Sequence, residues 1–124
     1  CALPIFSQVH TDAVDITVKE TVQRYARVDS LGLQDTYIIV LSGRESTCRK
    51  ETEQWLVDNG IPYDELYMRA EGDSRDDTIV KQELYEEWIK NRYNVRFVLD
   101  DRNKVVKMWR GLGLRVYHVQ EGDF

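Results

Sequence analysis

The sequence predicts an α/β fold with a parallel sheet. Three observations lead to this prediction: short apolar runs rich in β-branched residues, segments between them with apolar residues at helical spacing, and polar or glycine-containing turns at the boundaries. Strands that alternate with helices are joined by right-handed crossovers and therefore pair in parallel. The chain has 124 residues, close to the commonest domain size, and we expect a single domain over 1–124.

The first half of the chain is predicted to contain two helices and a buried strand. Apolar residues at helical spacing predict an amphipathic helix over Ile16–Val28, and the apolar run Tyr37–Leu41 predicts the strand. Ser46 or Thr47 is expected to cap the second helix, because hydroxyl side chains accept hydrogen bonds from the first N–H groups of a helix. This helix is expected to end near Asn59-Gly60, where glycine allows a left-handed stop.

The second half repeats the alternation of strand and helix. A polar, glycine-containing loop over 69–76 separates a weaker strand from the next helix, and Gly111 and Gly113 are expected to end the last helix. Trp55, Trp88 and Trp109 lie on predicted apolar helix faces and are expected in the core. The predicted elements are a strand over Glu65–Met68, a helix over Asp77–Asn91, a strand over Val95–Leu99, a helix over Asn103–Leu112 and a strand over Leu114–Val119.

Composition limits the classes of partner. The net charge is −5, from 22 acidic and 17 basic residues, so contact with a polyanion must be local. The two cysteines form neither a C-x-x-C pair nor a zinc set. Neither a targeting segment nor an apolar run of membrane-spanning length is visible, and we expect a cytoplasmic protein without membrane contact.

Polar clusters follow two of the predicted strands. Ser42-Gly43-Arg44 follows the first, and Asp100-Asp101-Arg102 follows the strand Val95–Leu99. Ligands bind outside the carboxyl ends of parallel strands, so the clusters are expected to converge on one crevice. A hydroxyl, approachable N–H groups and an arginine suit a phosphoryl group, and adjacent carboxylates suit magnesium. The alternatives are an ordinary turn with a surface arginine, and an aspartate that caps the helix beginning at Asn103.

Charged residues of the intervening loop and helix have two interpretations. Asp77 and Lys81 lie four residues apart on one helical face, which is typical of a surface ion pair and also of a lysine that neutralises a phosphoryl group. Taken alone, the spacing favours the surface pair. Arg69, Arg75 and Arg102 form either a basic rim for nucleic-acid phosphates or solvated loop charges.

Four ordered segments together resemble a known family, the 3′-phosphatase domain of phage-type polynucleotide kinase-phosphatases, in the haloacid dehalogenase superfamily. The segments are residues 38–46, 72–81 and 99–110 and the final Gly122-Asp123-Phe124. The resemblance extends from about Leu3 to the last residue. It implies a three-layer α/β sandwich with a parallel, Rossmann-like sheet. It also favours the active-site interpretation of Asp77 and Lys81.

The resemblance implies magnesium-dependent hydrolysis of a phosphomonoester at a polynucleotide 3′ end, through an aspartyl-phosphate, in nucleic-acid end repair. Phosphoryl transfer mainly requires placement and charge neutralisation, which agrees with the residue types present. The implied catalytic residues are Lys81, Asp77, Ser42 and Arg44; the implied substrate-binding residues are Ser42, Gly43, Arg44, Arg69, Arg75 and Arg102; the implied Mg²⁺ ligands are Asp101 and Asp100.

One family feature is absent from the sequence. The family's first strand carries an Asp-x-Asp-Gly-Thr stretch that supplies the nucleophile and the general acid, and these 124 residues do not contain it. We therefore expect a phosphatase domain that lacks its first strand. An attached kinase domain is a possible partner. Three hypotheses stay open: a polynucleotide 3′-phosphatase whose first strand lies outside this sequence, a noncatalytic module that binds nucleic-acid ends or proteins, and a phosphatase for small phosphate esters. The choice between DNA and RNA and the oligomeric state stay open as well.

Overall fold

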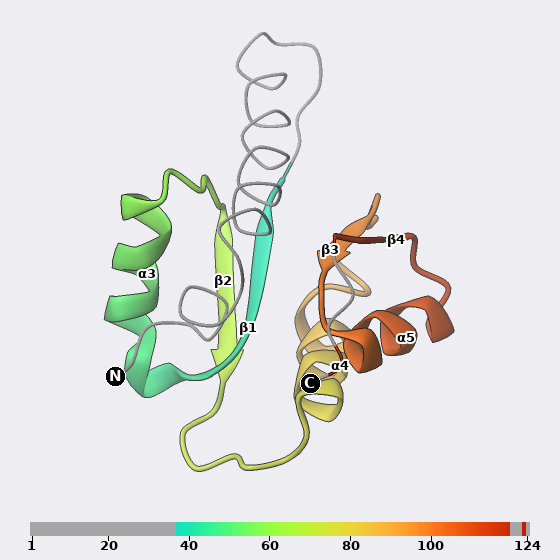
Figure 1. Ribbon diagram of the computed structural model, residues 1–124, viewed down its shortest axis with the longest axis horizontal. Helices are drawn as coiled ribbons and strands as arrows, with labels where there is room; N and C mark the ends of the chain where they lie inside the picture. Colours follow the sequence, from blue (N-terminus) through green and yellow to red (C-terminus); the bar gives the residue numbers. More distant parts are fainter. Residues whose placement is uncertain (1–36, 120–122, 124) are drawn as a thin grey trace, which may run out of the picture. The chain divides into compact units, whose positions relative to one another are not determined.

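The computed structural model describes residues 37–119 and 123 (Figure 1). The chain divides into two compact units, Cys1–Glu71 and Gly72–Phe124, and each is described by itself. The predicted helix over Ile16–Val28 lies outside the described residues. In the part of the chain that the structure describes, no helix is long and apolar enough to cross a membrane.

The first unit is a strand, a helix and a second strand. Strand β1 (Ile39–Glu45) pairs in parallel with β2 (Glu65–Arg69), and a 3₁₀ turn η1 (Ser46–Cys48) followed by helix α3 (Arg49–Asp58) connects them. Figure 1 shows α3 running alongside the two strands. The parallel pairing confirms the crossover that the alternating pattern predicts.

The core of the first unit follows from two periodicities. Helix α3 buries Thr52, Trp55 and Leu56, which are spaced three and four residues apart and so share one face. Strand β2 buries Leu66 and Met68, because alternate side chains of a strand point to the same side of the sheet. Together with Val40, Ile61 and Tyr63 at its edge, these apolar side chains form one cluster.

The ends of α3 agree only in part with the prediction. Gly60 has a φ of 64°, the left-handed conformation expected just after the helix. The predicted capping by Ser46 or Thr47 is wrong, since both residues lie inside η1 and neither η1 nor α3 has a side-chain hydrogen bond at its N-cap. The chain enters α3 through a tighter helical turn, which places the hydroxyls before the helix start.

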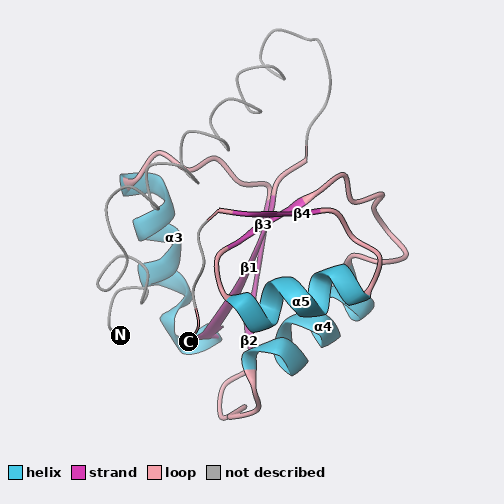
Figure 2. Ribbon diagram, turned by 45° about the vertical axis from the view of Figure 1, so that its right-hand side comes forward, coloured by secondary structure: helices cyan, strands magenta, loops and turns pink. Residues whose placement is uncertain are grey.

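The second unit repeats the alternation. Helix α4 (Asp77–Trp88) precedes β3 (Val98–Asp100), and α5 (Asn103–Gly111) connects β3 to its parallel partner β4 (Val116–His118). Helices α4 and α5 lie side by side (Figure 2). The buried apolar residues of this unit are Val80, Ile89, Val105, Val106, Trp109 and Val116.

Three local features differ from the predictions. Strand β1 continues to Glu45, so the polar cluster forms its end rather than a loop after it. Strand β3 begins at Val98 instead of Val95, because its ladder with β4 begins with the pair Val98 and Val116. Trp88 is 40% exposed instead of buried, since among the residues of α4 only Val80 is fully buried.

Candidate active site

The end of strand β1 carries a β-bulge. Ser42 is paired with Met68, and the next paired residues are Glu45 and Arg69, so two residues on β1 lie between pairs that are adjacent on β2. Bulges of this kind re-aim backbone and side chains, and they are frequent next to active sites. The bulge therefore distinguishes Gly43 and Arg44 from ordinary strand residues.

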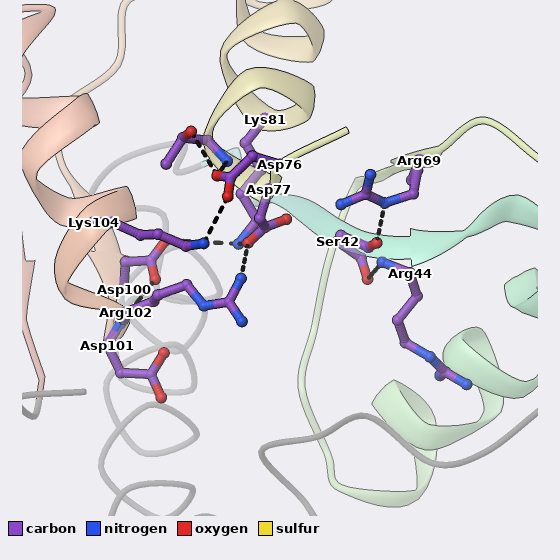
Figure 3. A network of polar contacts seen from close by, with 12 residues as sticks. Ser42, Arg44, Arg69, Asp76, Asp77, Lys81, Asp100, Asp101, Arg102 and Lys104 are labelled. Atoms are coloured by element: carbon purple, nitrogen blue, oxygen red, sulfur yellow. Dashed lines mark hydrogen bonds and ion pairs between the residues drawn. The ribbon is translucent and has the colours of Figure 1, made fainter. Parts of the chain in front are cut away.

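Two hydrogen bonds hold the bulge. The backbone N–H of Arg44 donates to the Ser42 hydroxyl at 3.2 Å. Arg69 donates from Nε to the Gly43 carbonyl at 2.7 Å, as Figure 3 shows. All four predicted substrate residues of the first unit thus meet at the bulge, where Arg69 contacts the backbone of Gly43.

The Arg44 side chain is bound to the start of α3. Its Nη1 donates to Thr52 Oγ1 at 2.8 Å, and the Thr52 hydroxyl donates in turn to the Cys48 carbonyl at 2.8 Å. Thr52 is 4% exposed, so this hydroxyl is a buried polar group with both of its hydrogen-bonding roles used. Thr52 was not among the predicted site residues, although a hydroxyl on the apolar face of a helix indicates that the residue has a specific partner.

In the second unit, Lys81 lies between two carboxylates. Its Nζ is 3.4 Å from Asp77 Oδ2 and 3.8 Å from Asp100 Oδ2, and all three side chains are 11–14% exposed (Figure 3). Arg102 Nη1 approaches the same oxygen of Asp77 at 3.2 Å. Asp77 and Lys81 therefore form a largely buried pair and not the exposed surface pair that their spacing alone favours.

Asp100 organises the turn between β3 and α5. Its Oδ1 accepts the backbone N–H groups of Asp101 at 2.9 Å and Arg102 at 3.2 Å, and its Oδ2 accepts the indole N–H of Trp109 at 3.3 Å. The alternative of an aspartate as N-cap of α5 is not observed, since Arg102 occupies that position without a side-chain cap. The Asp101 carbonyl lies 3.2 Å from the His118 ring.

Helix α4 begins at Asp77, as predicted, and the loop residue directly before it is its N-cap. Asp76 caps the helix by accepting the Thr78 N–H at 3.0 Å, and Lys104 of α5 donates to its other oxygen at 2.7 Å. The hydrogen bond from Lys104, followed by that from Thr78, holds the pKa of Asp76 well below its ordinary value. A second ion pair between the two helices thus lies next to the pair of Asp77 with Arg102.

Arg75 is held by two carboxylates. It binds Asp73 through Nε and Nη2 at 3.0 and 2.8 Å, and Nη1 contacts Glu83 of α4 at 2.6 Å. The hydrogen bonds with Asp73 and then Glu83 raise its pKa above the ordinary value. In this structure the guanidinium therefore fixes the loop before α4.

The donor set of Asp100 and Asp101 fits magnesium. Mg²⁺ typically takes one or two protein carboxylates and completes its shell with water and phosphate oxygens. Among the described residues, no group of three or more acidic, histidine or cysteine side chains could hold a metal, so Asp100 and Asp101 are considered as a pair. Both oxygens of Asp100 accept hydrogen bonds from within the protein.

Comparison with known families identifies the family to which the chain belongs. The family model of the polynucleotide kinase PNKP phosphatase domain matches residues 5–124. The chain belongs to this family. The PNKP phosphatase domains have the haloacid dehalogenase type of α/β fold, which confirms the predicted fold class and the resemblance.

Relatives of this PNKP phosphatase domain include viral and structurally characterised proteins. The "Putative bifunctional polynucleotide kinase/RNA ligase" of Autographa californica nuclear polyhedrosis virus is 37% identical over 79 residues, which are 63% of this chain and 11% of that protein. A chain in the structure of the Pnkp1/Rnl/Hen1 RNA repair complex matches with a TM-score of 0.79 and 42% identity, over 87% of this chain and 33% of that chain. In a second structure of the Pnkp1/Rnl/Hen1 complex the TM-score is 0.80 with 42% identity, over 88% and 36%. The chain thus spans about a tenth to a third of the length of these relatives.

The structure gathers the predicted residues within each unit. Ser42, Gly43, Arg44 and Arg69 meet at the bulge of the first unit, and Lys81 gathers with Asp77 and Asp100 in the second. The catalytic, substrate and metal roles of all these residues, and the convergence of the two clusters on one crevice, stay predictions.

Proposed function

We propose that this PNKP phosphatase domain serves a magnesium-dependent polynucleotide 3′-phosphatase that acts in nucleic-acid end repair. One observation carries the proposal: a largely buried lysine lies within 4 Å of two carboxylates from separate elements, inside the range that the family model matches. Such a lysine is held in place for an incoming anion, because the aspartates compensate its charge while the site is empty of substrate.

The residues of the chain would bind and neutralise the phosphoryl group. Lys81 would stabilise the charge that develops on it, and Asp77 would hold Lys81 in position. The Ser42 hydroxyl and the Arg44 guanidinium would engage its oxygens. Gly43 allows close approach of the backbone, because it has no side chain.

Magnesium would be held by Asp101, with Asp100 fixing the turn that presents it. When bound, the ion would neutralise phosphoryl oxygens and orient the ester. The carboxylates of this chain contribute hard oxygen donors, which suit Mg²⁺ better than the nitrogen and sulfur donors that zinc prefers.

The groups that make and break bonds belong to the family's Asp-x-Asp-Gly-Thr stretch, which these 124 residues do not contain. In the proposed reaction, the first aspartate of that stretch attacks phosphorus, and the 3′ oxygen leaves with a proton from the second. Water then attacks the aspartyl-phosphate, releasing inorganic phosphate and restoring the carboxylate. The present chain would supply charge neutralisation and metal binding for both steps.

RNA 3′-phosphate ends are the proposed substrate. The matched structures contain an RNA repair complex, and the viral relative carries the names of a polynucleotide kinase and an RNA ligase. Removal of a 3′-phosphate leaves the 3′ hydroxyl that an end-joining reaction requires. We therefore propose that the domain works together with kinase or ligase modules acting on the same ends.

The test uses this chain preceded by an Asp-x-Asp-Gly-Thr strand. Phosphate release is measured from an RNA oligonucleotide with a 3′-phosphate, with Mg²⁺ and with a chelator. The matched controls are the 5′-phosphorylated oligonucleotide, the DNA counterpart and a sugar phosphate. We expect Mg²⁺-dependent release from the 3′ end. Turnover of the sugar phosphate alone would replace the proposal with a small-ester phosphatase, and binding without turnover would replace it with a noncatalytic module.

A further inference from the structure

Trp109 of α5 is a buried tryptophan with a polar partner. Its side chain is 3% exposed, and its indole N–H donates to Asp100 Oδ2 at 3.3 Å. A buried indole N–H requires an acceptor, because leaving it unsatisfied costs free energy. Here the acceptor is one of the two carboxylates next to Lys81.

The other oxygen of Asp100 is fixed independently. Oδ1 accepts two backbone N–H groups, those of Asp101 and Arg102, so the carboxylate cannot rotate without breaking the turn. With Oδ1 fixed, the position of Oδ2 is fixed as well. Oδ2 accepts the indole N–H of Trp109 and lies 3.8 Å from Lys81 Nζ. The indole and the turn together set where this negative charge lies.

The Trp109 ring is itself held in place. It packs edge-on against Tyr85 of α4, with the ring centroids 5.7 Å apart and the planes at 81°. Edge-to-face contacts of this kind stabilise a particular ring orientation. Tyr85 belongs to the helix that also carries Asp77 and Lys81, so one indole joins α5, α4 and the end of β3.

We propose that Trp109 is a positioning residue, which fixes the Asp100 carboxylate against Lys81 through its indole N–H. The catalytic consequence rests on the proposed function. Asp100 is committed to the turn, the indole and Lys81, whereas Asp101 is the carboxylate assigned to magnesium. In this proposal Asp100 orients Lys81, and Asp101 binds the metal.

The contact is tested directly by NMR of the ¹⁵N-labelled chain, without any assay of activity. The indole N–H resonance of Trp109 is identified by its loss in Trp109→Phe. We expect this resonance to shift in Asp100→Asn, while the indole resonances of Trp55 and Trp88 stay in place. Asp101→Asn is the matched control, since it changes the neighbouring carboxylate, and it should leave the Trp109 resonance nearly unmoved. An unmoved Trp109 resonance in Asp100→Asn would overturn the proposal.

The consequence for turnover is tested with Trp109→Phe, which keeps an aromatic ring and removes the N–H. In the chain carrying the Asp-x-Asp-Gly-Thr strand, we expect kcat for the 3′-phosphorylated RNA to fall about tenfold, with KM nearly unchanged. Trp88→Phe makes the same chemical change at the far end of α4, roughly 16 Å from Asp77 along the helix, and should retain full kcat.

Wild-type kcat in Trp109→Phe would overturn the positioning role. Absence of turnover in the parent protein would instead contradict the proposed function, and the indole resonance would still decide whether Trp109 holds Asp100.

Discussion

At the scale of single residues, the main feature is Lys81, which lies between carboxylates from two elements. Asp77 belongs to the same helix, and Asp100 comes from the end of β3. With exposures of 11–14%, these charges interact more strongly than a surface pair would, because less water screens them. The two carboxylates hold the Lys81 side chain between the start of α4 and the end of β3.

Replacing Lys81 tests that role. We expect Lys81→Ala to reduce phosphatase turnover about a hundredfold or more, because it removes a preorganised positive charge from the transferring group. The measurement is kcat for the 3′-phosphorylated RNA, together with the urea midpoint of unfolding. Lys107→Ala, at an exposed position of α5, is the matched control. Unchanged turnover in Lys81→Ala would remove this residue from the mechanism.

Asp101 provides the test of the metal site. Asp101→Asn is expected to raise the Mg²⁺ concentration needed for half-maximal turnover and to lower the maximum, because an amide oxygen is a weaker ligand than a carboxylate for a hard cation. Turnover is measured over a magnesium titration. A variant with wild-type magnesium dependence would show that the ion binds elsewhere.

Asp76 gives a prediction for the effect of pH on stability. Its pKa is lowered by Lys104 and Thr78, and a carboxyl whose pKa is lower in the folded state stabilises that state above its unfolded pKa, then loses the effect as pH falls through the folded pKa. The urea midpoint of the wild type should therefore exceed that of Asp76→Asn at pH 6, and the difference should shrink below about pH 4. Asparagine is a suitable replacement, because it can still cap the helix. A difference that stays constant from pH 6 to pH 3 would contradict the assignment.

At the scale of helices and strands, local signals predicted the helices better than the strands. Helix periodicity is carried by the segment itself, so α5 begins at the predicted Asn103 and ends at Gly111, one residue before the predicted end. Strand ends depend on the partner. Strand β3 begins only where Val116 is available to pair with Val98, and β1 continues through a bulge until Glu45 meets Arg69. The sequence of either strand alone therefore does not show where the strand begins or ends.

The two glycines at the end of α5 provide an element-scale prediction. Gly113 has a φ of 84°, a conformation that strains residues with a Cβ, whereas Gly111 is helical, and a Cβ added at either position would have no atom within 4 Å. Gly113→Ala should lower the free energy of unfolding by about 1 kcal/mol, and Gly111→Ala should leave it unchanged or raise it by up to about 1 kcal/mol. Urea unfolding of both variants measures this. Equal effects of the two substitutions would show that backbone strain at Gly113 is not the cause.

The candidate site was predictable where residue type carries the chemistry and unpredictable where geometry does. Their place at the end of an apolar run singles out Asp100 and Asp101 in the sequence, whereas Lys81 is favoured only through the family resemblance, because its spacing from Asp77 alone is typical of a surface pair. It does not identify Thr52 or Trp109 as site residues, since each lies on an apolar helix face and shows its role only through its hydrogen-bond partner. Of the positions missed, Asp76 had the clearest signal, an aspartate directly before a helix.

At the scale of the whole molecule, the described strands form two parallel pairs, β1 with β2 and β3 with β4. Two-stranded sheets have little stability of their own and gain it from further strands or from helices packed against them. Members of the family are expected to carry the Asp-x-Asp-Gly-Thr strand in the middle of the sheet. The chain covers 33% and 36% of the chains in the two matched structures.

Supplying that strand is therefore expected to stabilise the fold as well as to permit chemistry. The 124-residue chain preceded by an Asp-x-Asp-Gly-Thr strand should unfold at a higher urea concentration than the chain alone, because a central strand satisfies backbone groups on both of its sides. A strand of equal length with two prolines in place of ladder donors is the control. Identical urea midpoints for all three proteins would contradict a central position of the strand.

The bulge at the end of β1 also determines one hydrogen bond of the Ser42 hydroxyl. Because the Arg44 amide donates to Ser42 Oγ, a lone pair of that oxygen is engaged from within the backbone, and the single hydroxyl proton stays available to donate. The hydroxyl therefore keeps the one group through which it could donate to an acceptor such as a phosphoryl oxygen. A small irregularity in strand pairing thus fixes where the serine oxygen lies without using its proton.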